Sequence, residues 1–257
     1  IFIESMGKLN SINKYSFLIL SAGINKRFKM KNFNSPKSLL KIKNESLLEI
    51  ILKNLRKKKI KKVNIIVGYK HNEIRKEVTK FKVKPKINYI KINDYDKYGS
   101  AYSIFKFRNE WKKLKKSFVM LHSDLYCDWD YFNKVIEDKN ENTIGITNYN
   151  DKKREKSFLG TDVRKGKIIT ISYLKNLKKY YGQISCINKF SSKTTYELFK
   201  FMKNYFLIDN NKKKTWELVI NDFIKAKSSI DFHTTKKNYK NWYNVNKIED
   251  YLKINKF

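Results

Sequence analysis

Apolar runs alternate with segments of helical periodicity along the first half of the chain. The runs predict buried strands at 16–21, 63–67 and 117–121, alternation predicts a strand at 87–92, and the periodic segments predict helices at 47–55, 72–81 and 99–111. Ser46 precedes the first of these helices and Glu49 lies in its first turn, which is typical of a capping box. Strands that alternate with helices predict an α/β fold with a parallel sheet that is covered on both faces.

The second half has shorter strands and fewer helices. Its pattern predicts strands at 143–147, 158–163, 167–173, 183–187, 230–233 and 242–245, and helices at 191–205, 216–226 and 247–254. Gly166 supplies a turn between two of these strands. No repeat or low-complexity linker separates the two halves, so we expect one continuous domain over 16–257, preceded by an N-terminal extension over 1–15.

Three segments of the first half are expected at one rim of the sheet, because ligands of such sheets bind at the carboxyl ends of the strands. These segments are 22–37, 68–69 and 122–124. The small residues Ser21, Ala22 and Gly23 end the first strand, so their backbone N–H groups can approach a phosphate closely. Arg27 and Lys37 follow and add positive charge, which favours a phosphorylated ligand.

The same segment resembles a family signature, L-x-A-G-x-x-x-R-[FM]…P-K, here written by Leu20-Ser21-Ala22-Gly23, Arg27-Phe28 and Pro36-Lys37. That signature is typical of nucleotidyltransferases with a Rossmann-like fold, including sugar-1-phosphate transferases and phosphocholine cytidylyltransferases. The resemblance implies a Rossmann-like three-layer sandwich with a mixed, mainly parallel sheet. It also implies transfer of a nucleoside monophosphate from an NTP to a small phosphorylated acceptor, with release of pyrophosphate, in which Arg27 and Lys37 are catalytic. Asn25 stands where many members have a second glycine.

A magnesium site is also implied by the resemblance. Asp124 directly follows a buried strand and resembles the family's Mg²⁺-binding aspartate; alternatively it caps the following helix. Residues 242–251 resemble the pattern W-x-[DE]-[VI]-[DG]-T-x-E-D, in which many members carry a second acidic ligand. This chain has Asn244 and Asn246 at the two acidic places, and we expect Asn246 to be the ligand. An amide oxygen can bind Mg²⁺ but brings no charge, so the metal site is expected to be weaker, or the chain binds nucleotide without catalysis.

Further contacts follow from the same resemblance. Gly99 and Ser100 match the Gly-Thr-Ala segment that contacts the base, although Ser100 could instead cap a helix. The acceptor-binding lobe is expected at about 140–235, with Lys156, Gly182 and Gln183 as contacts. The donor is CTP or another NTP. A sugar-1-phosphate is the favoured acceptor, and phosphocholine with CTP is the alternative.

Composition bears on the partners. The formal charge of +34 favours either a nucleic acid or membrane partner, or a surface biased towards lysine; we favour the second, because lysines occur in nearly every segment. No helix-turn-helix, zinc or RNP-type signature is present, so no specific nucleic acid partner is expected. No apolar run is long enough to span a bilayer. Cys127 and Cys186 show no disulfide or zinc pattern, which is consistent with a cytoplasmic protein.

Overall fold

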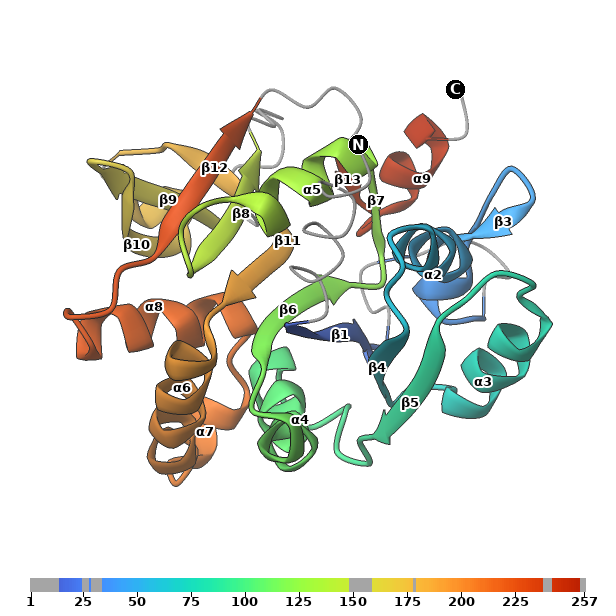
Figure 1. Ribbon diagram of the computed structural model, residues 1–257, viewed down its shortest axis with the longest axis horizontal. Helices are drawn as coiled ribbons and strands as arrows, with labels where there is room; N and C mark the ends of the chain where they lie inside the picture. The colour runs from blue at the N-terminus through green and yellow to red at the C-terminus, as the bar shows by residue number, and fades with distance from the viewer. Residues whose placement is uncertain are drawn as a thin grey trace, which may run out of the picture.

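The computed structural model describes residues 14–24, 28, 34–147, 159–177, 179–237 and 242–254. Within these ranges nine strands form one mixed sheet in the spatial order β5, β4, β1, β6, β11, β8, β12, β10, β9 (Figure 1). The strands are β1 (Tyr15–Ser21), β4 (Lys62–Val67), β5 (Lys86–Lys91), β6 (Ser117–His122), β8 (Thr143–Thr147), β9 (Leu159–Arg164), β10 (Lys167–Tyr173), β11 (Gly182–Phe190) and β12 (His233–Lys237). β10 and β11 run against the direction of the other strands, so the sheet is mixed and mainly parallel.

Helices cover both faces of this sheet (Figure 1). One layer consists of α2 (Leu47–Lys57), α3 (His71–Lys80) and α5 (Trp129–Glu137), and the other of α4 (Ser100–Leu114), α6 (Ser192–Tyr205) and α8 (Trp216–Ala226). Side chains of β1 alternate between the layers: Phe17 and Ile19 pack with the first, and Leu18 packs with the second. The predicted α/β three-layer sandwich is therefore confirmed. None of the helices in the described ranges is long and apolar enough to cross a membrane.

Local signals in the sequence placed most elements correctly. The side chain of Ser46 accepts a hydrogen bond from the backbone N of Glu49 at 3.2 Å, so the cap that was predicted for α2 is present. Gly166 has a φ of 76° in the turn between β9 and β10, as a glycine at a turn allows. Asp128, not Asp124, caps α5, because its side chain accepts from the backbone N of Asp130.

One predicted strand, 230–233, is displaced, because β12 begins only at His233 and runs to Lys237. Ile230 belongs to the turn after α8, where its backbone N donates to the Lys227 carbonyl at 3.0 Å. Phe232 is 1% exposed and belongs to the core between the sheet and α8. Phe232 is therefore apolar because it is buried against a helix. Pairing with β8 starts only at His233.

The end of the chain returns to the rim where β6 ends. Strand β13 (Trp242–Asn244) pairs antiparallel with β7 (Leu125–Cys127), and the backbone N of Val245 donates to the Asp124 carbonyl at 2.9 Å. The last helix, α9 (Ile248–Ile254), shares a small apolar cluster with β2 (Lys41–Ile42) and the first turn of α2. The short elements η1 (Lys37–Leu39) and β3 (Glu45–Ser46) flank β2 in the sequence. Segments from both ends of the chain thereby meet beside β1 and β6. Two further short helices lie in the described residues, α7 (Asp209–Lys212) and η3 (Leu174–Asn176).

Candidate functional site

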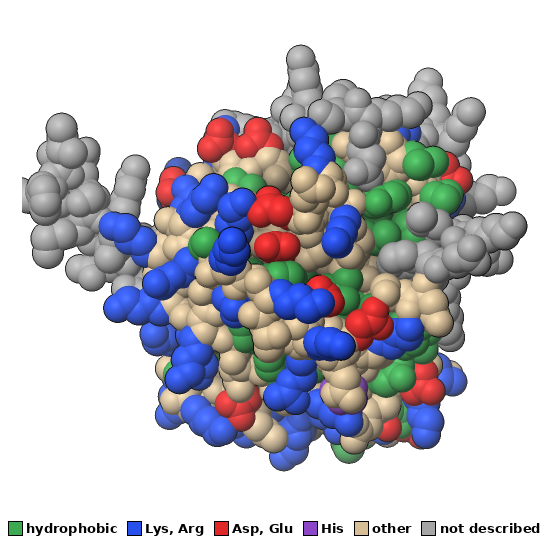
Figure 2. All heavy atoms as spheres, turned by 90° about the vertical axis from the view of Figure 1, so that its right-hand side faces the viewer, with side chains coloured by type: hydrophobic (Ala, Val, Ile, Leu, Met, Phe, Trp, Pro, Cys, Tyr) green, Lys and Arg blue, Asp and Glu red, His purple; other side chains and the backbone are tan. Residues whose placement is uncertain are grey.

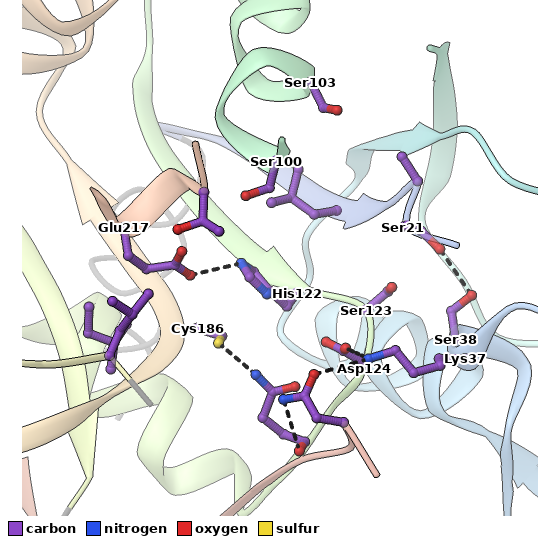
Figure 3. A pocket seen from close by; sticks show the side chains of 18 of the residues that line it. Ser21, Lys37, Ser38, Ser100, Ser103, His122, Ser123, Asp124, Cys186 and Glu217 are labelled. Atoms are coloured by element: carbon purple, nitrogen blue, oxygen red, sulfur yellow. Dashed lines mark hydrogen bonds and ion pairs between the residues drawn. The ribbon is translucent and has the colours of Figure 1, made fainter. Parts of the chain in front are cut away.

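A pocket of about 410 Å³ opens at the carboxyl ends of β1 and β6 (Figure 3). Its walls come from the loop after β1, the first turns of α4 and α8, the ends of β10 and β11, and the segment that contains β13. The residues that line it include Ser21, Ala22, Gly23, Lys37, Ser38, Ser100, His122, Asp124, Tyr173, Gln183, Cys186, Thr215, Glu217, Asn244 and Asn246. This is the rim at which parallel α/β sheets bind ligands.

The end of β1 forms one wall of the pocket. Ser21, Ala22 and Gly23 all line it, and the Ser21 hydroxyl donates a hydrogen bond to the Ser38 hydroxyl at 3.0 Å (Figure 3). A Cβ atom at Gly23 would meet nothing within 4 Å, so the backbone here faces open space. Gly68, at the end of the neighbouring β4, has the opposite environment, because a Cβ atom there would lie 2.9 Å from the Ala22 carbonyl oxygen. A glycine at 68 therefore lets β4 and β1 approach closely.

Lys37 joins the two residues that were predicted to bind metal. Its Nζ forms an ion pair with the Asp124 carboxylate and lies 3.3 Å from the Asn246 Oδ1 and 3.0 Å from the Val245 carbonyl oxygen (Figure 3). Burial by itself would raise the pKa of Asp124, but the charges of Lys37 and His122 together with hydrogen bonds from Lys37 and the backbone outweigh it and lower the pKa below its usual value. Asp124 is thus an ionised carboxylate held at the end of β6 by a lysine from η1.

Asn246 is positioned by the start of α9. The Asp250 carboxylate accepts from the backbone N of Asn246 at 3.0 Å and from that of Lys247 at 2.9 Å. This is the reach-back half of a capping box, and Asp250 is only 2% exposed. Asp250 therefore lies in the first turn of the helix that was predicted over 247–254, and its two hydrogen bonds fix the backbone at Asn246.

Residues 16–257 match the family model of the nucleotidyl transferases. The chain belongs to this family. Among curated proteins, this chain is 22% identical over 239 residues to choline-phosphate cytidylyltransferase of Streptococcus pneumoniae (strain ATCC BAA-255 / R6). The match covers 92% of this chain and 95% of the relative.

Solved structures share the fold of this nucleotidyl transferase. CTP:phosphocholine cytidylyltransferase from Streptococcus pneumoniae has a TM-score of 0.74 at 20% identity, over 94% of this chain and 98% of that one. The inositol-1-phosphate CTP transferase from T. maritima has a TM-score of 0.73 at 13% identity, over 92% and 91% of the two chains. A UDP-glucose pyrophosphorylase complexed with UDP-glucose has a TM-score of 0.72 at 13% identity, over 94% and 97%. Family membership makes the chain an enzyme of the nucleotidyltransferase type.

The two residues that were predicted to contact the base have different surroundings in this nucleotidyl transferase. Ser100 lines the pocket, and its Oγ accepts from the backbone N of Trp216 at 2.9 Å, so it helps to hold the start of α8. Gly99 itself is the N-cap of α4, and Ser100 makes no side-chain cap there. A Cβ atom at Gly99 would lie 2.1 Å from the Lys214 carbonyl oxygen, so this glycine admits the backbone that precedes α8.

The predicted acceptor contacts are only partly within the described residues. Gln183 lines the pocket, and its Oε1 is a buried atom without a hydrogen-bond partner among the described residues. Gly182 packs against β8 instead, where a Cβ atom would lie 3.0 Å from the Thr147 carbonyl oxygen. Arg27 and Lys156 lie outside the described residues.

Three further pocket residues were not predicted as site residues: His122, although 122–124 was expected at this rim, Cys186 and Glu217. They come from the end of β6, from β11 and from the first turn of α8, and their ligand atoms lie within 4.8 Å of one another. Burial, together with the charges of Glu217 and Asp124, raises the pKa of the Cys186 thiol well above its usual value. Sequence patterns carry no signal for this group, because a glutamate in the first turn of a helix is common for reasons of capping and helix dipole alone.

Proposed function

We propose that this nucleotidyltransferase transfers CMP from CTP to a small phosphorylated acceptor with a cationic group, of the phosphocholine type, and releases pyrophosphate. The observation that carries the proposal is the buried carboxylate of Glu217, 8% exposed, in the same pocket as Lys37 and Asp124. The name of the similar choline-phosphate cytidylyltransferase supports both the donor and the acceptor.

The charges of the pocket favour an acceptor that carries a negative group at one end and a positive group at the other. Among the described residues that line it, Lys37 carries the ammonium charge, whereas Asp124 and Glu217 carry carboxylates. Phosphates are attracted to the side where Lys37 lies, and a cationic group offsets the charge of Glu217. Tyr173 also lines the pocket, and a tyrosine ring adds cation–π attraction for a quaternary ammonium group.

The proposed reaction needs positioning more than acid–base catalysis. A phosphate oxygen of the acceptor attacks the α-phosphorus of CTP in line, and pyrophosphate leaves with the bonding electron pair. The attacking oxygen is already anionic, so no strong general base is required. Lys37 would offset charge on the phosphates, and the exposed backbone at Gly23 would let N–H groups approach them.

The donor set at Asp124 fits a magnesium ion. The carboxylate of Asp124 and the amide oxygen of Asn246 both contact the same ammonium group, so a positive charge is already favoured at that place. Mg²⁺ prefers one or two such oxygens together with phosphate oxygens and water. Asp124 and Asn246 would hold the ion, and the ion would neutralise charge on the nucleotide phosphates.

A sugar-1-phosphate is a second candidate acceptor. Three buried oxygen atoms that line the pocket have no hydrogen-bond partner among the described residues: Gln183 Oε1, Thr215 Oγ1 and Asn244 Oδ1. Buried polar atoms are normally paired, so these oxygens suit the hydroxyl groups of a ligand. The UDP-glucose pyrophosphorylase of similar fold supports this candidate.

Product formation with paired acceptors tests the proposal. Purified protein is assayed with CTP, Mg²⁺ and either phosphocholine or glucose-1-phosphate, and pyrophosphate release is measured. We expect turnover with phosphocholine, and Glu217→Gln should raise the KM for phosphocholine at least tenfold, about 1.4 kcal/mol, with the KM for CTP unchanged. The matched control is Glu110→Gln on α4, outside the residues that line the pocket. Turnover with glucose-1-phosphate alone would overturn the proposal in favour of the second candidate.

Thermal unfolding with each NTP separates catalysis from binding. A ligand at about 100 times its Kd adds roughly 2.7 kcal/mol, which raises the Tm of a chain of this size by roughly 5–10 °C. A shift with CTP and Mg²⁺ together with turnover supports the enzyme. A shift without turnover with either acceptor would favour a protein that binds nucleotide only.

A further inference from the structure

The strongest unassigned feature is the cluster of His122, Cys186 and Glu217, on the other side of the pocket from Lys37 (Figure 3). These are a nitrogen, a sulfur and an oxygen ligand from three elements that are distant in sequence. His122 Nε2 lies 3.7 Å from Glu217 Oε1, and all three ligand atoms lie within 4.8 Å of one another. Four-coordinate zinc with bonds of about 2.0–2.3 Å places its ligand atoms roughly 3.3–3.8 Å apart, so shifts of about 1 Å would close the site.

His122 and Cys186 each have an unusual feature that is not explained by lining a pocket. His122 Nε2 is buried and has no hydrogen-bond partner among the described residues, although buried polar atoms are normally paired. Cys186 lies at an irregularity of β11 between Ile184 and Asn188 and has a φ of 65°. A residue other than glycine in this region is strained by about 1 kcal/mol or more. The Cys186 side chain lines the pocket there.

Asn244 supports the thiol from the outside. Its Nδ2 donates a hydrogen bond to Cys186 Sγ at 3.2 Å (Figure 3). Hydrogen bonds of this kind to ligand atoms are typical of the groups that surround a bound metal. A metal that binds the sulfur displaces its proton to solvent, and the sulfur then binds as the thiolate.

We propose that His122, Cys186 and Glu217 form a binding site for a borderline-soft divalent metal ion such as Zn²⁺. The nitrogen, sulfur and carboxylate set selects such ions, whereas the oxygen atoms of Asp124 and Asn246 suit Mg²⁺. The pocket therefore contains two cation sites of different chemistry. Since three protein ligands leave a fourth position open to the pocket, the ion exchanges with solution.

If the proposed function holds, occupation of this site also affects the reaction. A metal ion on Glu217 neutralises the carboxylate that would bind the cationic group of the acceptor. Zn²⁺ should therefore compete with the acceptor and not with CTP.

Cobalt spectroscopy tests the site without any substrate. Co²⁺ is added to the metal-free protein, and the near-ultraviolet thiolate-to-cobalt absorption band is followed to saturation. We expect a band with a stoichiometry of about one ion per chain that Zn²⁺ abolishes. Cys186→Ser should remove the band, and Cys127→Ser should keep it, because Cys127 is the matched buried thiol outside the pocket. Glu217→Gln, which keeps the thiol, should retain the band but weaken Co²⁺ binding at least tenfold.

Absence of the band from the wild-type protein would overturn the proposal, and so would a band that survives in Cys186→Ser. Circular dichroism of each variant shows whether it is folded. If Cys186→Ser does not fold, Glu217→Gln still tests the site. Because the readout needs neither nucleotide nor acceptor, a failed acceptor assay would overturn the proposed function and leave the metal site standing.

Discussion

Lys37 is the residue on which the nucleotide side of the pocket depends. It contacts Asp124, Asn246 and the Val245 carbonyl, and these partners are brought together from β6 and from the segment after β13. Lys37→Ala and Asp124→Ala should each reduce kcat by about 10²–10³-fold, since each removes a charge that acts on the phosphates in the transition state. The measurement is steady-state turnover, with circular dichroism to show an intact fold. Near-normal turnover in both variants would contradict the assigned roles.

The same ion pair predicts how stability depends on pH. The pKa of Asp124 is lowered in the folded chain, so the ion pair stabilises the fold above the usual pKa of an aspartate and is lost as the pH falls through the lowered value. Asp124→Asn should therefore cost about 1–3 kcal/mol at pH 7, and the difference from wild type should shrink towards pH 3. Urea unfolding at the two pH values measures this. An equal loss of stability at both pH values would show that the charge of Asp124 is not the cause of that loss.

At the scale of elements, two glycines of the predicted site have opposite environments. A Cβ atom at Gly23 would face open space. A Cβ atom at Gly99 would lie within 2.6 Å of the backbone carbonyl oxygens of Lys213 and Lys214. That backbone leads into α8, which carries Glu217, so Gly99 decides how closely the start of α8 approaches α4.

Paired substitutions separate these roles. Gly99→Ala should destabilise the fold by about 2–4 kcal/mol, because carbonyl oxygens at such distances must move. Gly23→Ala should change the stability by less than about 1 kcal/mol but weaken CTP binding, since a methyl group would stand where phosphates are proposed to approach. Thermal unfolding and CTP titration of both variants give the comparison. Equal loss of stability in the two would contradict it.

At the scale of the whole molecule, the charge of +34 dominates. Lysine and arginine side chains are spread over the face seen in Figure 2, with acidic side chains between them, and they do not gather in one patch there. A positive charge spread in this way repels itself in the compact state.

Salt should therefore stabilise this protein. Between about 0.01 M and about 1 M salt the Debye length falls from about 30 Å to about 3 Å, so self-repulsion is screened and the Tm should rise by several degrees. The KM for CTP should rise over the same range, because the field that attracts phosphates is screened as well. Calorimetry and kinetics measure the two effects. A Tm that falls with salt would mean that attractive ion pairs outweigh the repulsion.

Duplex DNA tests the other interpretation of the charge. A gel shift that is lost steeply with salt is required of a nucleic-acid-binding protein. We expect no specific complex, because the described pocket and the family point to a nucleotide. A specific complex at physiological salt would reverse that expectation.

The sequence by itself determined the features that depend on neighbouring residues. Buried strands such as β1 and β6, the cap at Ser46 and the signature around Lys37 and Asp124 are local patterns, since periodicity and capping act over a few residues. These patterns were sufficient for the fold, for the family and for the rim at which the pocket lies. They misplaced β12, which was predicted at 230–233 and found at His233–Lys237, because the buried Phe232 lies just before the strand.

Only the tertiary structure decided which distant residues share the pocket. Glu217 enters it because α8 packs closely beside Gly99, and Cys186 enters it through an irregularity in β11. Asn246 reaches Lys37 because β13 pairs with β7. Periodicity shows which face of an element is buried, but the partner of that face depends on contacts between segments far apart in the chain. The acceptor side of the pocket is built from such contacts, and for that physical reason the sequence left it open.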